Sequence, residues 1–139
     1  MKSDDAPRRP LPVVTPETRH FWEGTQRGEL LLQRCEDCGD AYFPPRPFCP
    51  HCAGSHVAVF PASGRGSLHS FVISHLPTAG FTPPYAIAIV ALEEGPHMLS
   101  NIVECPQTPE ALQLDMPLSV VFVAASDSVT LPLFRPGAA

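Results

Sequence analysis

Two Cys-x-x-Cys pairs, Cys35/Cys38 and Cys49/Cys52, constrain the fold of this chain more than any other feature. Ten residues separate the two pairs, which take up four of the chain's five cysteines. A Cys-x-x-Cys turn brings two thiolates close enough to bind one metal ion, and two such turns complete the four-thiolate shell of a structural zinc site. The spacing therefore predicts one structural zinc ion bound by all four cysteines.

The residues around the pairs support this interpretation over disulfide or redox chemistry. Gly39 and Gly54 follow the pairs, where a tight turn favours a small residue or one with positive φ. No apolar segment typical of a signal peptide follows Met1, so we expect no secreted disulfide framework. A thioredoxin-like site uses one pair, not two pairs that flank a proline-rich loop. We expect the nearby histidines to be ordinary polar residues, because four cysteines already fill the shell: His51, His56 and His69.

Composition favours a small, mainly β protein. The chain has 139 residues, of which 44% are hydrophobic, and this suits one compact domain or two small modules with a common interface. The 18 prolines disfavour long helices and predict short strands and shaped loops. No apolar run approaches the roughly 18 residues that a membrane span requires. We therefore expect a soluble, cytoplasmic protein with no membrane partner.

The first part of the chain is expected to contain an arm, a helix and the zinc ribbon. Residues 1–14 are polar and proline-rich, and they predict a loose arm. Thr15-Pro16-Glu17 is typical of a helix start, with Thr15 as the N-cap, and Gly24 is expected to end the helix after Glu23. The other elements expected here are short strands at residues 29–34 and 57–60 and an extended loop at residues 42–48.

The second part of the chain has the alternating pattern and turn residues of short strands. The expected elements are strands at residues 67–75, 85–92, 97–104, 118–125 and 129–134, a long loop at residues 76–84, and one helical turn at residues 108–112. Five strands with a helical turn before the fourth predict a closed OB-fold barrel, and a five-stranded sandwich fragment is the alternative. The expected parts are an arm and helix (1–28), a zinc ribbon (29–62) and an OB-fold barrel (63–139).

Charge is divided unevenly between the two halves. Residues 1–66 carry eight basic and eight acidic side chains, whereas residues 67–139 carry only Arg135 against six acids, so the second half holds the whole net charge of −5. A zinc ribbon with an OB-fold also occurs in nucleic-acid-binding modules, which is the alternative function. Binding of single strands requires a basic groove with stacking aromatic residues. The acidic barrel therefore predicts no nucleic-acid partner.

An ordered series of segments resembles the DUF35 family, whose members combine a rubredoxin-like zinc ribbon with an OB-fold. The segments that carry the resemblance are Phe21-Trp22-Glu23-Gly24, Gly28 to Cys35, Cys38-Gly39, Phe43-Pro44-Pro45-Arg46, Cys49-Pro50-His51-Cys52, Gly66 to Phe71, Pro84-Tyr85, Leu92 to Gly95, and Leu131 to Pro136. Two positions depart from the family pattern. Asp115 stands where a glycine is usual, and Pro96-His97 replaces a segment that often leads to an arginine.

The resemblance implies a non-catalytic accessory subunit associated with acyl-CoA. Such proteins bind thiolase-like enzymes, acyltransferases, acyl-CoA aldolases or hydratases, and the partner supplies the catalytic residues. The accessory subunit helps to form the path taken by CoA or acyl-CoA. We therefore expect zinc as the cofactor, an acyl-CoA enzyme as the partner, and no catalysis by this chain alone.

The remaining side chains show no catalytic constellation. Cys105 lies in no recognisable motif and is expected to be an inert thiol. The strand histidines and the turn acids are expected to be hydrogen-bonded or solvated: His69, His75, His97, Glu93 and Glu94.

Four residues are candidates for contact with CoA or with the partner. Phe21 and Trp22 form the aromatic end of the helix, where they can anchor the helix or line an acyl path. Arg46 lies in a proline-rich loop, where it can form a surface salt bridge or contact a CoA phosphate. Phe81 lies near the tip of the loop at residues 76–84, a candidate contact surface.

Overall fold

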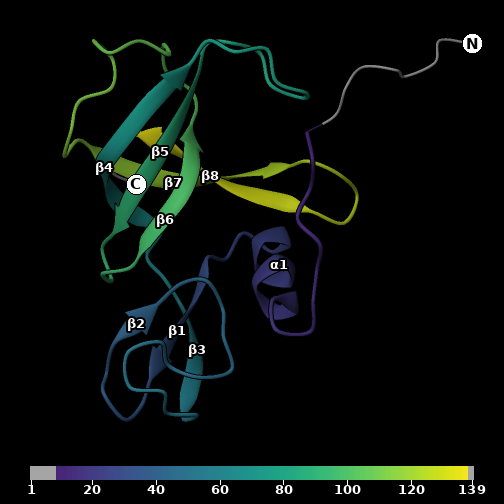
Figure 1. Ribbon diagram of the computed structural model, residues 1–139, viewed down its shortest axis with the longest axis vertical. Helices are drawn as coiled ribbons and strands as arrows, with labels where there is room; N and C mark the ends of the chain where they lie inside the picture. The colour runs from purple at the N-terminus through teal and green to yellow at the C-terminus, as the bar shows by residue number, and fades with distance from the viewer. Residues whose placement is uncertain (1–8, 138–139) are drawn as a thin grey trace, which may run out of the picture.

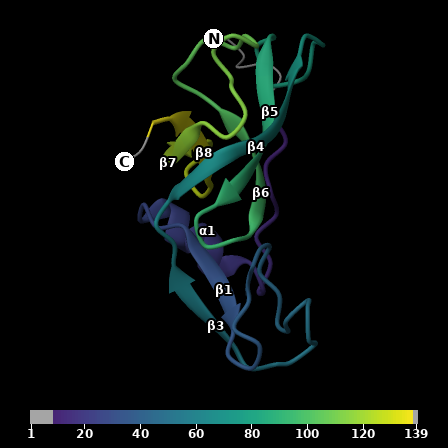
Figure 2. The same ribbon diagram turned by 90° about the vertical axis from the view of Figure 1, so that its left-hand side faces the viewer.

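The computed structural model describes residues 9–137, which form one helix and eight strands (Figure 1). A zinc ribbon lies at one end and a β-barrel at the other, with the helix beside their junction (Figures 1 and 2). Of the expected N-terminal arm, residues 1–8 lie outside the described residues. Residues 9–14 have no regular secondary structure and run past the barrel toward the helix.

Helix α1 (Arg19–Gln26) begins and ends later than the sequence pattern indicated. The expected start at Thr15 is wrong, because Thr15 and Thr18 bond to each other in a turn that precedes the helix: the Thr15 N–H donates to Thr18 Oγ1 at 3.0 Å. The expected end at Glu23 is also wrong, because Gly24 lies inside the helix. A Cβ on Gly24 would lie 2.8 Å from Leu31 Cδ1, so this glycine allows the following strand to approach closely. No helix within residues 9–137 has the length and apolar character needed to cross a membrane.

The ribbon sheet is built around β1 (Leu31–Cys35). This strand pairs antiparallel with β2 (Ala41–Tyr42) on one side and with β3 (Val57–Pro61) on the other. The β1–β3 register runs from Leu31 opposite Pro61 to Cys35 opposite Val57. As a result, Cys35 lies at the end of a strand that is paired on both sides.

The remaining strands form a closed five-stranded barrel with the order β4-β5-β6-β8-β7. Their bounds are β4 (Arg65–Ser74), β5 (Tyr85–Leu92), β6 (His97–Ile102), β7 (Pro117–Ala124) and β8 (Thr130–Pro136). In β5 every second residue from Ala86 to Leu92 is buried, as expected for a strand with one face toward a core. The barrel closes through the β4–β7 pairing and the parallel β6–β8 pairing at Ile102 and Phe134. The predicted mainly β fold is confirmed, and the sandwich alternative is wrong.

One hydrophobic core fills the barrel and continues beneath α1. Leu68, Leu118 and Phe134 lie at its centre with no measurable exposure. Leu112 joins this core from the turn expected at residues 108–112, in which the N–H groups of Ala111 and Leu112 both donate to Thr108 O at 3.2 Å. The helix and ribbon contribute to the same core through the buried side chains Phe21, Leu30 and Leu32. This shared core fixes the ribbon relative to the barrel.

Candidate metal centre and adjoining cleft

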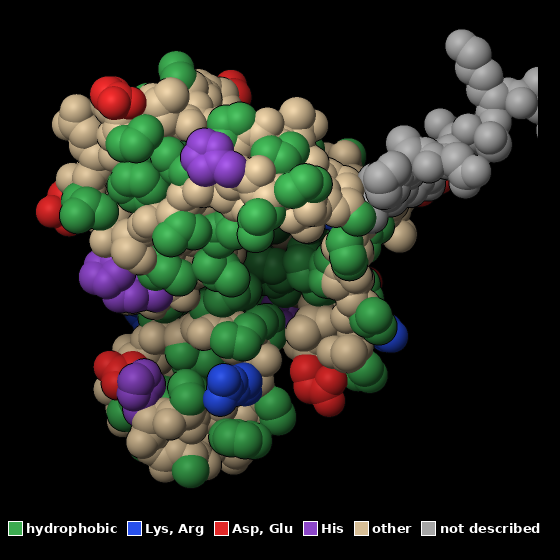
Figure 3. All heavy atoms as spheres, turned by 45° about the horizontal axis from the view of Figure 1, so that its top comes forward, with side chains coloured by type: hydrophobic (Ala, Val, Ile, Leu, Met, Phe, Trp, Pro, Cys, Tyr) green, Lys and Arg blue, Asp and Glu red, His purple; other side chains and the backbone are tan. Residues whose placement is uncertain are grey.

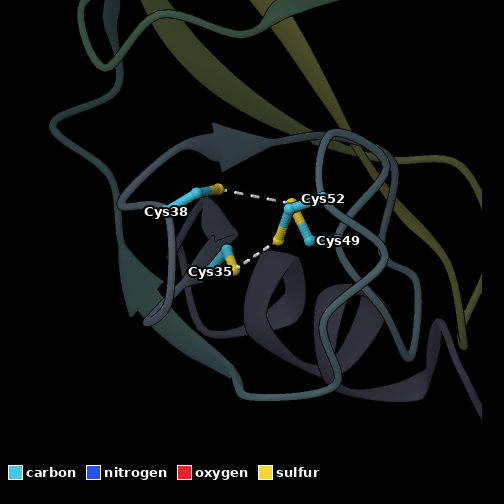
Figure 4. A group of neighbouring side chains, drawn as sticks. All are labelled: Cys35, Cys38, Cys49 and Cys52. Carbon is cyan, nitrogen blue, oxygen red and sulfur yellow. Dashed lines mark hydrogen bonds between the residues drawn. The ribbon is translucent and has the colours of Figure 1, made fainter.

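The four cysteines of the two pairs converge on one point in the ribbon (Figure 4). Their sulfur atoms all lie within 4.8 Å of one another, with Cys35 and Cys52 3.5 Å apart and Cys38 and Cys49 3.6 Å apart. Four thiolates around zinc at a bond length of about 2.3 Å have sulfur–sulfur distances of about 3.8 Å in a regular tetrahedron. The geometry therefore fits zinc.

The four sulfur atoms form a closed shell, and backbone hydrogen bonds favour the thiolate form of one of them, Cys49. Cys35 and Cys49 are buried, whereas Cys38 and Cys52 face outward. Although burial acts in the opposite direction, hydrogen bonds from the backbone N–H groups of Cys52 and His51 lower the pKa of Cys49 to about 7. With four protein ligands the site leaves no position for a substrate, which is the property of a structural zinc site. The chain carries one structural zinc ion.

The two knuckles repeat one backbone pattern. The N–H of Gly39 donates to Cys35 O at 2.8 Å, and the N–H of Ala53 donates to Cys49 O at 2.9 Å. Both residues have left-handed backbone angles, with φ of 81° for Gly39 and 64° for Ala53. The left-handed residue of the second knuckle is therefore Ala53, and the sequence pattern did not indicate it.

Glycine is needed at position 54 for a different structural reason than at position 39. A Cβ on this residue would lie 2.7 Å from Asp37 Oδ2 and 3.3 Å from Cys52 Sγ. The carbonyl of Gly54 accepts a hydrogen bond from the Cys49 N–H at 2.8 Å. Gly54 therefore allows the two cysteine loops to pack closely against each other.

The three nearby histidines lie outside the metal-binding group. His56 Nδ1 lies 3.2 Å from Asp37 Oδ2 on the ribbon surface, while His51 contributes its backbone N–H to Cys49 Sγ. His69 lies on the barrel, where its ring centroid is 4.5 Å from that of His97.

A cleft of about 380 Å³ separates the ribbon from the barrel and contains Arg46. Its other titratable lining side chains are Tyr42, His51 and His97, and no carboxylate from residues 9–137 lines it. Figure 3 shows hydrophobic side chains gathered around the hollow between the two modules. A cleft with an arginine, two imidazoles and no acid suits an anionic group.

Two residues that sequence reasoning missed hold Arg46 in place. The Arg46 N–H donates to Gln33 Oε1 at 2.6 Å, and the Tyr42 hydroxyl donates to Arg46 O at 2.9 Å. Gln33 is a buried polar residue in the centre of β1. A polar residue in the middle of an apolar strand was the only sequence signal for this role.

The predicted aromatic pair divides into a buried and an accessible member. Phe21 is 2% exposed and packs against Trp22 and Phe43, with ring centroids 4.9 Å and 5.1 Å away. Phe21 and Trp22 both line a cavity of about 210 Å³ on the barrel side of α1. Phe43 lines both this cavity and the cleft of Arg46, so the two spaces adjoin.

Phe81 lines neither of these two spaces and lies in the loop between β4 and β5. Its ring stacks on Tyr85 with centroids 4.6 Å apart, and the Arg9 guanidinium lies 4.1 Å above it. The structure therefore brings Arg46 and Trp22 into adjoining spaces and places Phe81 with Arg9. Sequence reasoning missed Arg9 because it treated residues 1–14 as a loose arm.

The side chains that were weighed for catalysis have structural surroundings. Burial raises the pKa of the Cys105 thiol, which makes the thiolate scarce at neutral pH. Glu93 pairs with Arg65 at 3.1 Å, and hydrogen bonds from Ser63 and Arg65 lower the pKa of its carboxyl group. Glu94 accepts the Ser63 N–H at 2.8 Å. The two turn acids thus tie the start of the barrel to its β5–β6 turn.

The metal centre and the closed barrel together define a zinc-ribbon plus OB-fold protein. Two family models match the chain: the rubredoxin-like zinc ribbon domain of ChsH2 over residues 22–57, and the C-terminal OB-fold domain of ChsH2 over residues 60–123. The chain is also 36% identical over 113 residues to a DUF35 domain-containing scaffold protein of Methanothermobacter thermautotrophicus, covering 79% of this chain and 84% of that protein. The chain belongs to the DUF35 family, as the resemblance predicted.

Other similar proteins have names that refer to enzymes, one of them an enoyl-CoA hydratase. A probable enoyl-CoA hydratase alpha subunit of Thermomonospora curvata is 33% identical over 129 residues, which cover 92% of this chain but only 40% of that subunit. A solved structure titled "Ltp2-ChsH2(DUF35) aldolase" contains a chain that matches with a TM-score of 0.80 and 31% identity, over 91% of this chain and 98% of that chain.

Proposed function

We propose that this protein is a non-catalytic accessory subunit that binds a thiolase-like or related acyl-CoA enzyme. The observation that carries the proposal is the match to the chain in the Ltp2-ChsH2(DUF35) aldolase, which extends over 98% of that chain. A benzoylsuccinyl-CoA thiolase subunit from Thauera aromatica is also 34% identical over 73 residues. These names support an acyl-CoA enzyme as the partner class.

The surroundings of the weighed side chains support a role without catalysis. The Cys105 thiol has a raised pKa, and the Glu93 and Glu94 carboxylates are engaged with Arg65 and Ser63. The zinc shell is filled by protein ligands, so the metal offers no position for a substrate. The partner would supply the nucleophile and the base.

We further propose that CoA or acyl-CoA passes between the ribbon and the barrel. Arg46 would meet the CoA phosphates with His51 and His97, since these side chains line one acid-free cleft. Trp22 would line the next section of the path, because Phe43 borders both spaces. Phe81 and the surface above the buried Phe21 would contact the partner. The ribbon (29–62) and the barrel (63–139) act in this proposal as two walls, with the arm and helix (1–28) at their side.

Co-expression with a thiolase-like enzyme tests the accessory role. We expect the two proteins to copurify, the partner to gain activity or stability in the complex, and this chain alone to show no acyl transfer, hydration or carbon–carbon cleavage. Turnover by the isolated chain would refute the accessory role. A partner that is equally active and stable alone would leave this chain without the proposed function.

The proposed CoA contact has a matched control within the chain. Arg46→Ala should raise the KM of the complex for acyl-CoA about tenfold or more, because a charge-assisted phosphate contact is lost. Arg135→Ala removes another half-exposed arginine, which pairs with Glu104 outside the cleft, and should leave KM unchanged. Equal effects of the two variants would overturn the assignment of Arg46.

The alternative function, nucleic-acid binding, predicts a different result. Residues 67–139 carry one arginine against six acids, and Arg65 at the start of the barrel pairs with Glu93. Like charge opposes the phosphate backbone, so titration with single-stranded DNA or RNA at moderate salt should show no tight binding. Salt-sensitive binding at low micromolar concentration would reverse the ranking of the two functions.

A further inference from the structure

A trough lined mainly by apolar side chains runs along the barrel beside the N-terminal arm. It consists of two cavities, one of about 470 Å³ lined by Leu11 and Val123, and the cavity of about 210 Å³ lined by Trp22. The two cavities share the lining residues Arg9, Leu131 and Leu133, so they adjoin beneath the arm. We call the two cavities together the trough. The volume of the larger cavity lies in the range of small-molecule sites, which is about 300–1,000 Å³, and the smaller cavity extends it.

Apart from Arg9, whose guanidinium lies over the Phe81 ring, the polar side chains in the wall of the trough are hydrogen-bonded within the chain. Ser100 Oγ donates to Pro132 O at 2.9 Å, and Asn101 Nδ2 donates to Ala86 O at 2.7 Å. Ser126 Oγ accepts the N–H groups of Ser128 and Val129 at 3.2 Å and 3.0 Å. These three side chains therefore require no hydrogen bonds from an occupant. A site of this kind suits a hydrocarbon chain better than a polar group.

The arm is held over the trough by an aromatic clasp of Arg9, Phe81 and Tyr85. The Arg9 guanidinium lies 4.1 Å from the Phe81 ring centroid, and Phe81 stacks on Tyr85 at 4.6 Å. The Tyr85 hydroxyl donates to Thr78 Oγ1 at 3.2 Å, which fixes the stack on its loop. A Cβ on Gly80 would overlap the backbone of Arg9, so glycine allows the arm to lie against this loop. Figure 1 shows the arm passing the β7–β8 hairpin on its way to α1.

We propose that the trough binds the aliphatic acyl chain of a thioester ligand, and that residues 9–11 form a strap that closes over this chain. The inference deepens the proposed acyl-CoA function and rests on it for the source of the ligand. It assigns the chemical class of the occupant and the direction in which it lies. The acyl chain extends from Trp22 toward Val123, away from the cleft that contains Arg46.

A chain-length series with the purified full-length protein tests the site. The probes are CoA, octanoyl-CoA and decanoyl-CoA, measured by calorimetry and by the fluorescence of Trp22, the only tryptophan. Each methylene that becomes buried should tighten binding roughly fourfold, so decanoyl-CoA should bind more tightly than octanoyl-CoA, and CoA most weakly. The two acyl-CoA probes should also change the emission of Trp22. Equal affinities for the three probes would overturn the acyl-chain site.

Two matched variants locate the bound chain. Val123→Phe fills the end of the trough and should weaken decanoyl-CoA binding at least tenfold while leaving CoA binding unchanged. Val72→Phe places the same ring on β4 at a residue that lines neither cavity and is 60% exposed, and it should leave both affinities unchanged. Equal losses in the two variants, or no loss in either, would overturn the location. A protein that binds a partner but no acyl probe refutes the trough alone, whereas one that binds decanoyl-CoA but no partner enzyme refutes the proposed function alone.

The strap can be tested separately, through the rate at which the acyl-CoA ligand dissociates. Gly80→Ala should displace the arm from its loop, and Arg9→Ala should remove the cation–π contact of the clasp. Both variants should speed dissociation of decanoyl-CoA severalfold in stopped-flow measurements without changing the rate for CoA. Unchanged dissociation rates in both variants would show that the arm does not close over the ligand.

Discussion

The zinc ribbon and the barrel are held together by different forces. The ribbon is a three-stranded sheet with two long loops, and some of its apolar side chains, such as Phe48 and Val59, are about half exposed at 50% and 46%. The barrel closes on itself around Leu68, Leu118 and Phe134, which have no measurable exposure. The ribbon therefore depends on metal coordination for its loops, whereas the barrel depends on the burial of apolar surface. This difference explains how one chain of 139 residues can combine a rigid loop surface with a stable core.

Loss of zinc should produce the largest difference in stability between the two modules. Binding of a structural zinc ion contributes roughly 10–16 kcal/mol to small zinc-finger folds, and this free energy is coupled to folding. Cys35→Ser, or a strong chelator, should therefore unfold the cysteine loops while the barrel keeps its dispersed amide resonances in NMR spectra. Elemental analysis should give about one zinc per chain for the wild type. A wild-type protein that is fully folded without metal would contradict this prediction.

Truncation of a side chain in the barrel core should lower the stability of the protein without changing its zinc content. Phe134→Ala removes a fully buried ring at the point where β6 and β8 meet, and such changes cost about 3–5 kcal/mol. We expect the midpoint of denaturant unfolding to fall accordingly, with the zinc content per folded molecule unchanged. Phe48→Ala, at a half-exposed ring of the ribbon, is the control and should change stability by less than about 1 kcal/mol. Equal losses in the two variants would mean that the ribbon has a hydrophobic core of its own.

The contact between α1 and β1 links the two modules, and Gly24 tests it. A Cβ at this position would lie 2.8 Å from Leu31 Cδ1 and 3.2 Å from Glu29 O. We expect Gly24→Ala to destabilise the protein by about 1–3 kcal/mol through overpacking, although alanine is the better helix former by about 1 kcal/mol. Thermal unfolding measures the net change in stability that results from these two opposing effects. An increase in stability would show that Gly24 and Leu31 are not in close contact.

Local sequence patterns predicted much of this architecture. The apolar run Tyr85–Leu92, bounded by the turn residues at 93–96, identified β5 to the residue. The spacing of the four cysteines identified the metal centre, because coordination requires only those ligands at that separation. Both features depend on interactions that repeat along a short segment of the chain.

The features that sequence patterns missed depend on contacts between distant segments. The sequence pattern indicated Gly24 as the end of the helix, because the contact with Leu31 that requires a glycine there is not visible in the local sequence. Gln33 orients Arg46 across the ribbon, and the closeness of Arg9 to Phe81 appears only after the barrel has closed. A sequence pattern reports the environment of a residue along one element. It carries little information on which loop will lie beside it.

The smallest expected effects come from two left-handed residues, one in each module. Ala53 in the second knuckle has φ of 64°, and Asp115 at the entry to β7 has φ of 67°. A left-handed backbone costs a non-glycine residue about 1–2 kcal/mol, and glycine loses roughly 0.5–1 kcal/mol of chain entropy in return. Ala53→Gly and Asp115→Gly should therefore each stabilise the folded protein by up to about 1 kcal/mol. The two gains should differ in their dependence on metal: chelation should abolish the gain at Ala53, because the knuckle no longer holds that angle, and should leave the gain at Asp115 intact. Chemical denaturation of both variants, with and without chelator, measures this difference, and equal losses on chelation would show that the two modules unfold as one unit.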